Sequence, residues 1–247
     1  MKEGYTHISV VLDRSGSMQS CLNDTIGGFN SFLQAQRDVE GEATVSLIQF
    51  DDQYEVVCQM TPIIDALGLT HETYTPRGMT ALLDAIGRTM NETEHALSEM
   101  GEDEKPEKVI FVIITDGEEN SSREFQRDNI MDMINRHREE DSWEVIFIGA
   151  NQDAIQSGGS MGIRAGATLN YDQTSQGTQV MYASLTRGMT NYRSMAVEDT
   201  LDSNFFAGDD AAAQKASPDI TSSGVKVKGP LDRMSVDTRN YQDDQGD

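Results

Sequence analysis

Residues 8–17 have the sequence ISVVLDRSGS, and this stretch decides the fold class. Its mainly apolar start, Ile8 to Leu12, predicts a strand that is buried on both faces, and Asp13 follows where that strand ends. A second apolar run, Val109 to Ile114, is followed in the same way by Thr115-Asp116-Gly117. Both aspartates therefore lie at the carboxyl ends of strands, the edge at which open α/β sheets bind their ligands.

Strand and helix patterns alternate along the chain as far as about residue 195. Further strands are expected at residues 43–50, 54–60, 109–115, 145–149 and 167–171. Helices are expected at residues 23–39, 80–100, 124–138, 151–161 and 176–195. This alternation predicts an α/β fold of three layers, in which a doubly wound, Rossmann-like and mostly parallel sheet carries helices on both faces.

One pair of strands is expected to be antiparallel. The link at residues 51–53 is so short that the strands on either side of it must form a hairpin. The second strand of this hairpin, Tyr54 to Met60, carries apolar residues and could pair with another chain if it lies at the edge of the sheet.

The composition changes near residue 199, beyond which the chain holds little apolar material to bury. We therefore expect one domain over residues 1–198 and an acidic, polar tail over residues 199–247 that is largely disordered. Within this tail, residues 225–234 contain enough apolar side chains to dock as a short segment.

The charge of the chain limits its partners. Its 42 acidic residues outnumber its 19 basic residues, which gives a formal net charge of -23. Such a charge repels the phosphates of nucleic acids and anionic lipids, so direct binding to nucleic acid or to a membrane is not expected. It favours cations and basic protein surfaces. One charge-based alternative stays open: an acidic decoy that blocks a nucleic-acid-binding enzyme.

The chain is expected to work in the cytoplasm. Its first seven residues lack the basic segment and apolar core of a secretory signal, and no apolar stretch approaches the length of a membrane span. The two cysteines, Cys21 and Cys58, are too few for a disulfide framework and fit a reducing compartment.

The polar residues at the strand ends form a candidate metal site. The first loop offers Asp13, Ser15 and Ser17, the segment Gly78-Met79-Thr80 offers Thr80, and the second apolar strand delivers Asp116. These side chains present only oxygen atoms, which suit a hard divalent cation such as Mg²⁺ or Mn²⁺. Because only two of them are carboxylates, a bound ion would keep positive charge and could accept a carboxylate from a partner protein.

The set Asp13-x-Ser15-x-Ser17, Thr80 and Asp116 resembles the metal-ion-dependent adhesion site of von Willebrand factor A domains, in particular the stand-alone cytoplasmic A-domain proteins of bacteria and phages. The resemblance extends from about Thr6 to Met195. It implies a six-stranded sheet whose third strand is antiparallel. It also implies that the two serines, and often the threonine, contact the ion directly, whereas the two aspartates act through water. The implied function is Mg²⁺-dependent binding of a partner's Asp or Glu.

Five side chains next to this site are expected to contact the partner: Arg14, Met18, Arg77, Met79 and Glu118. The two arginines would steer an incoming carboxylate towards the ion. The two methionines flank the site and offer adaptable apolar contacts. The glutamate belongs to an acidic loop that adds negative potential close to the metal.

An enzyme is the main alternative to a binding module. A metal-dependent phosphatase or phosphotransferase could use Asp13 as its nucleophile, because such enzymes place an aspartate after the first strand. They need a second acid two residues later, where this chain has Ser15, and an activating lysine for which the sequence offers no candidate. These differences favour a protein without enzymatic activity.

Overall fold

The computed structural model describes residues 1–150, 154–200 and 204–207, all within one compact unit, Met1–Ala216. The strands are β1 (Lys2–Asp13), β2 (Glu42–Phe50), β3 (Tyr54–Pro62), β4 (Pro106–Thr115), β5 (Glu144–Ala150) and β6 (Thr168–Tyr171). They form one six-stranded sheet in the order β3-β2-β1-β4-β5-β6. β3 is antiparallel to β2 and every other pairing is parallel, which confirms the predicted sheet and its antiparallel edge strand.

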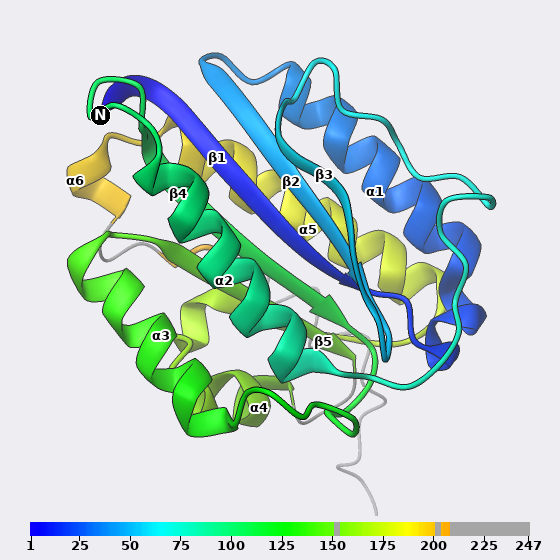
Figure 1. Ribbon diagram of the computed structural model, residues 1–247. Helices are drawn as coiled ribbons and strands as arrows, with labels where there is room; N and C mark the ends of the chain where they lie inside the picture. Colours follow the sequence, from blue (N-terminus) through cyan, green and yellow to red (C-terminus); the bar gives the residue numbers. More distant parts are fainter. Residues whose placement is uncertain (151–153, 201–203, 208–247) are drawn as a thin grey trace, which may run out of the picture. The chain divides into compact units, whose positions relative to one another are not determined.

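Helices cover both faces of this sheet (Figure 1). The α-helices are α1 (Leu22–Arg37), α2 (Leu82–Ser98), α3 (Arg127–Glu140), α4 (Ala154–Ser160), α5 (Ser175–Ser194) and α6 (Val197–Thr200). Two short 3-10 helices, η1 (Gly16–Cys21) and η2 (Ala165–Ala167), complete the described elements. α1 and α5 pack on one face and α2 and α3 on the other (Figure 1). The core is accordingly divided into two apolar clusters, one on each side of the sheet.

The alternation of side chains along β4 shows why the sheet is buried on both faces. Ile110 and Val112 belong to the cluster under α1 and α5, whereas Phe111 and Ile113 belong to the cluster under α2 and α3. A strand with apolar side chains on both faces is stable only between two helical layers. None of the described helices has the length and apolar character that a membrane span requires.

Most element bounds differ from the sequence-based expectation by a few residues, and two of the differences have a clear structural cause. The helix expected from residue 124 begins at Arg127, because the carboxylate of Asp84 accepts hydrogen bonds from the backbone N–H groups of Arg123, Glu124 and Phe125 at 2.8–2.9 Å. These bonds hold the three residues in a loop against α2.

The core also continues past residue 198, where the domain was expected to end. Phe205 and Phe206 are buried in the cluster under α5. A Cβ atom at Gly188 of α5 would lie only 2.5 Å from the Phe205 ring, so the absence of a side chain there makes room for this aromatic residue. The rest of the predicted tail, including residues 225–234, lies outside the described residues.

His7 in β1 gives the fold a predictable dependence on pH. Its ring is fully buried, with Nδ1 2.9 Å from the Thr44 hydroxyl and Nε2 3.0 Å from the Ser9 hydroxyl. Burial lowers the pKa of His7 from 6.5 to about 3, because the protonated ring would carry a charge in the interior. Between these values the unfolded chain binds a proton that the folded protein does not.

The free energy of unfolding is therefore expected to fall as the pH drops below 6.5, by about 2 kcal/mol at pH 5 from His7 alone. Urea unfolding at pH 7.5 and pH 5 measures this loss. The variant His7→Gln should lose about 2 kcal/mol less than the wild type over this interval. The control His71→Gln, at an exposed side chain, should behave as the wild type. If His7→Gln loses as much unfolding free energy between pH 7.5 and pH 5 as the wild type does, groups other than His7 cause the loss.

Candidate metal centre

The candidate site lies where β1 and β4 end side by side. The two strands are parallel neighbours, and Leu12 pairs with Ile114 in their register. Asp13 and Asp116, which follow these residues closely, therefore emerge at the same edge of the sheet. This is the arrangement expected if the first and fourth strands are adjacent, and it brings both carboxylates to one place.

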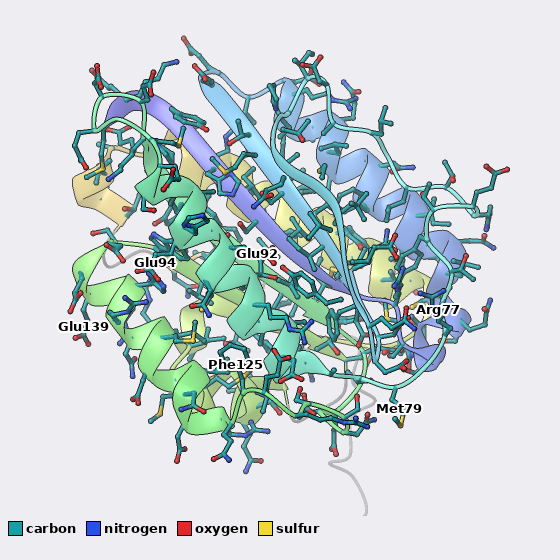
Figure 2. The ribbon with its side chains drawn as sticks, in the orientation of Figure 1. Arg77, Met79, Glu92, Glu94, Phe125 and Glu139 are labelled. Atoms are coloured by element: carbon teal, nitrogen blue, oxygen red, sulfur yellow. The ribbon has the colours of Figure 1, made fainter. Side chains whose placement is uncertain are left out.

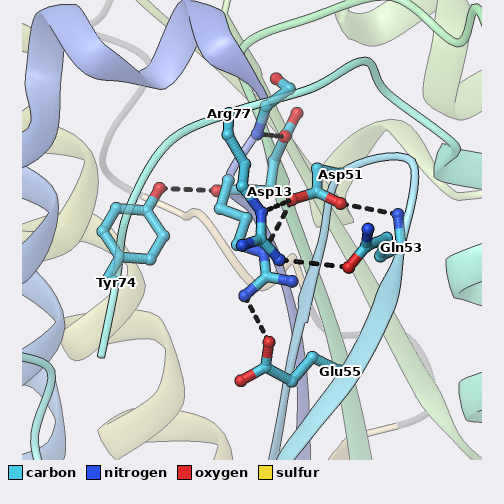
Figure 3. Close-up of polar contacts among 8 residues, drawn as sticks. Asp13, Asp51, Gln53, Glu55, Tyr74 and Arg77 are labelled. Atoms are coloured by element: carbon cyan, nitrogen blue, oxygen red, sulfur yellow. Dashed lines mark hydrogen bonds and ion pairs between the residues drawn. The ribbon is translucent and has the colours of Figure 1, made fainter. Parts of the chain in front are cut away.

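Asp13 is held rigidly at this edge. Its side chain is 0% exposed, with Oδ1 accepting a hydrogen bond from the Ser15 backbone N–H at 2.6 Å and Oδ2 accepting one from the Thr115 hydroxyl at 2.6 Å. Its carbonyl oxygen accepts a hydrogen bond from the Tyr74 hydroxyl at 2.6 Å (Figure 3). Burial raises the pKa of Asp13 to about 6, because the charged form loses its hydration.

The two serines of the first loop connect this edge to Asp116. The hydroxyl oxygens of Ser15 and Ser17 lie 3.1 Å apart, and Ser17 Oγ donates a hydrogen bond to Asp116 Oδ1 at 2.7 Å. Burial also raises the pKa of Asp116. Burial disfavours the charged form of such a carboxylate. A nearby cation therefore stabilises that form more than it stabilises a fully hydrated carboxylate.

Thr80 reaches the same place from the segment before α2. A Cβ atom at Gly117 would lie 3.2 Å from Thr80 Oγ1 and 3.7 Å from Ser17 Oγ, so both hydroxyls approach the bare backbone of this glycine. The backbone N–H of Thr80 donates to Asn120 Oδ1 at 2.9 Å, and the Asn120 N–H donates to the Thr80 carbonyl at 3.0 Å. These reciprocal bonds fasten the Thr80 segment to the loop after β4.

The two serine hydroxyls are close enough to share one small cation. Mg²⁺ binds six oxygens octahedrally at about 2.0–2.1 Å, which places neighbouring ligand atoms about 2.9 Å apart. The oxygens of Ser15 and Ser17 are 3.1 Å apart, close to this value. Within the described part of the chain, no group of three or more His, Cys, Asp or Glu side chains is placed to hold a metal.

Gln173 also belongs to this arrangement, and the sequence analysis missed it. It follows β6 directly, and its side-chain Nε2 donates hydrogen bonds to Asp116 Oδ2 and, at 3.1 Å, to the Ser17 carbonyl. An amide in a polar loop carries no motif signal. The signal that could have found it is positional, because β6 is parallel to β5 and ends at the same edge of the sheet.

Two of the residues expected to contact a partner are buried in the structure. Arg14 is only 4% exposed, because its Nε donates to Asp51 Oδ2 at 3.1 Å and its Nη1 to Glu55 at 2.6 Å (Figure 3). Met18 is 1% exposed and packs in the core under α1 and α5. Both side chains are therefore engaged inside the protein.

The other three expected contacts are accessible. Met79 is 53% exposed and lies at the outer edge of the molecule beside the site (Figure 2). Arg77 is also exposed, although its Nε donates to Asp51 Oδ2 at 2.8 Å. Glu118 is exposed on the loop after β4. These three residues stay predictions for partner binding.

Comparison with known proteins identifies the fold. Residues 8–119 match the model of the von Willebrand factor type A domain. The chain has the fold of an A domain. No curated protein matches it in sequence. Solved structures support the assignment at the level of the fold, among them the von Willebrand factor domain of the type V pili tip protein Mfa5 from Porphyromonas gingivalis. That domain has a TM-score of 0.52 and 8% identity, and the match covers 77% of this chain and 97% of that one.

Two further structures share the A-domain fold. The pilus adhesin SpaC from Lactobacillus rhamnosus GG has a TM-score of 0.55 and 12% identity, over 77% of this chain and 31% of the adhesin. Proximal thread matrix protein 1 from the mussel byssus, solved with a zinc-occupied adhesion-site motif, has a TM-score of 0.53 and 15% identity, over 72% of this chain. The chain spans less than half of the mussel protein, 46% of its length.

Proposed function

We propose that this A domain is a protein-binding module that holds Mg²⁺ or Mn²⁺ and takes up an Asp or Glu side chain of a partner protein. The observation that carries the proposal is the convergence of oxygen-bearing side chains from three separate segments at the end of β1 and β4. The mussel protein, whose adhesion-site motif holds zinc, supports the view that the fold accommodates a divalent cation.

Each residue of the proposed site has a distinct task. The hydroxyls of Ser15, Ser17 and Thr80 would contact the ion, and Asp13 and Asp116 would hold water molecules bound to it. When bound, the ion supplies a positive charge with an open coordination position. Asp13 is suited to a fixed role because both of its carboxylate oxygens are already positioned by hydrogen bonds. The site therefore needs little reorganisation to receive the ion.

The ion would supply the positive charge that an acidic ligand needs at this edge. The segments gathered here, residues 13–20, 51–53, 76–81, 116–123 and 172–175, carry seven acidic and three basic side chains. A partner carboxylate would therefore be repelled by the metal-free site and attracted only once a cation is bound. Arg77 and Met79, both exposed, would contact the partner around the ion.

The burial of Asp13 speaks against the enzyme alternative. A nucleophilic aspartate needs a free oxygen that can reach a substrate. Asp13 is 0% exposed, and its two oxygens accept hydrogen bonds from Ser15 and Thr115. The two free cysteines, Cys21 and Cys58, are compatible with the further proposal that the module acts in the cytoplasm.

Affinity capture from lysate, with and without EDTA, tests the proposal together with titration of the protein with Mn²⁺. We expect bound proteins to be lost in EDTA and in the variant Thr80→Ala, which removes a hydroxyl but keeps the backbone bonds to Asn120. The control Thr61→Ala, near the opposite end of the β2–β3 hairpin, should capture the same proteins as the wild type. Capture that survives EDTA but fades with salt would indicate the acidic decoy instead.

A further inference from the structure

A side chain that lies more than 50 residues beyond the other site residues in the sequence reaches the proposed metal site. Gln173 follows β6, and β5 lies between β6 and β4 in the sheet. Its Nε2 nevertheless contacts Asp116 at the end of β4 and the carbonyl oxygen of Ser17 in the loop after β1. One neutral side chain thus joins three segments that are distant in sequence.

The chemistry of these contacts fixes the orientation of the Gln173 amide. Both partners, the carboxylate of Asp116 and the carbonyl of Ser17, are hydrogen-bond acceptors only. The atom that faces them must therefore be the Nε2 donor and not Oε1. As a result, one oxygen of Asp116 is held by the Ser17 hydroxyl and the other by Gln173.

We propose that Gln173 is a positioning residue of the metal site, which fixes the carboxylate of Asp116 and adds no charge to the site. This inference rests on the proposed function. Groups that hydrogen-bond around a metal's ligands orient them, and their removal typically costs 10–100-fold in metal affinity. Gln173 would orient Asp116, and through it a water bound to the ion, while leaving the site with two carboxylates, so that a bound ion keeps the positive charge needed to accept a partner's carboxylate.

Two substitutions at Gln173 separate the hydrogen-bond donor from the charge. Gln173→Leu removes the donor, and we expect the affinity for Mn²⁺ to fall about tenfold. Gln173→Glu also removes the donor but adds a third carboxylate beside Asp116, which attracts the cation. We expect it to bind Mn²⁺ more tightly than Gln173→Leu does and to weaken the EDTA-sensitive capture of partners, because the ion is then more fully neutralised.

The experiment is titration of the full chain with Mn²⁺ alone, accompanied by thermal melting in EDTA to confirm that each variant folds. Gln179→Leu is the matched control, since Gln179 lies on α5 and hydrogen-bonds to Asp24 at 3.0 Å, outside the site. It should bind Mn²⁺ as the wild type does. Weaker Mn²⁺ binding in Gln173→Leu, with an unchanged melting temperature in EDTA, would support the proposal, because a merely structural role would lower the melting temperature as well.

The possible failures are distinguishable. If the wild type binds Mn²⁺ and Gln173→Leu binds it equally well, the positioning role is overturned while the proposed function stands. If Gln173→Leu melts at a clearly lower temperature in EDTA, the side chain supports the loop and does not merely orient the carboxylate, which also overturns the role. If the wild type itself does not bind Mn²⁺, both proposals fall together.

Discussion

Replacing Asp51 with alanine is expected to lower the free energy of unfolding by about 3–5 kcal/mol. Asp51 is 0% exposed, and its Oδ2 accepts hydrogen bonds from the guanidinium groups of Arg14 and Arg77 at 3.1 and 2.8 Å. Its Oδ1 accepts a hydrogen bond from the Gln53 N–H at 2.6 Å (Figure 3). Without this carboxylate, the buried Arg14 keeps only Glu55 as an acidic hydrogen-bond partner among the described contacts.

Urea unfolding measures this effect, and Asp52→Ala is the matched control. Asp52 is the next residue in the same turn and is exposed, so its loss should change stability by less than about 0.5 kcal/mol. The double variant Asp51→Ala/Arg14→Leu should recover much of the loss, because it removes the unpaired charge as well. A cost below about 1 kcal/mol for Asp51→Ala would mean that Arg14 can turn to solvent, and the expected contact with a partner would regain support.

The second large effect is expected at Asp13. We expect Asp13→Asn to weaken Mn²⁺ binding about a hundredfold while the metal-free protein stays at least as stable as the wild type. Burial raises the pKa of Asp13 to about 6, which shows that the interior disfavours its charged form. Asparagine has the same shape without the charge, and its Oδ1 can still accept from the Ser15 N–H. Its Nδ2 can donate to the Thr115 hydroxyl, which then donates to the Gly117 carbonyl, 3.1 Å away.

Titration with Mn²⁺ at pH 8, where Asp13 is charged in the wild type, and thermal melting in EDTA measure the two parts of this prediction. Asp24→Asn serves as the control, because Asp24 lies in α1 and contacts Ser175 and Gln179, away from the ion. Unchanged Mn²⁺ affinity in Asp13→Asn would place the metal elsewhere. A large fall in the melting temperature of Asp13→Asn in EDTA would mean that the charged Asp13 side chain stabilises the fold even without a metal.

Much of this architecture could be predicted because it depends on local patterns. Apolar runs such as Val109 to Ile114 identify strands buried on both faces, and the three-residue link at 51–53 leaves the hairpin no other geometry. Asp13 and Asp116 come together as soon as their strands are neighbours, since parallel strands end at the same edge. The position of residues that directly follow parallel strands can therefore be predicted from the sequence.

The errors came from pairings that only the folded chain creates. Arg14 was expected to face a partner because it lies beside the metal motif, yet Asp51, 37 residues away, holds it in the interior. Gln173 was overlooked because its contacts with Ser17 and Asp116 cross 156 and 57 residues. Phe205 fits against Gly188 for a similar reason, since the space for its ring exists only after α5 has packed. No local periodicity encodes such contacts.

The paired hydrogen bonds between Thr80 and Asn120 have a mechanical consequence. Since each residue both donates to and accepts from the other, the segment before α2 and the loop after β4 are joined at this point. They are joined a second time where Asp84 at the start of α2 accepts hydrogen bonds from three successive N–H groups just before α3. A substitution that removes either set of bonds therefore leaves the other to hold Thr80 near the end of β4.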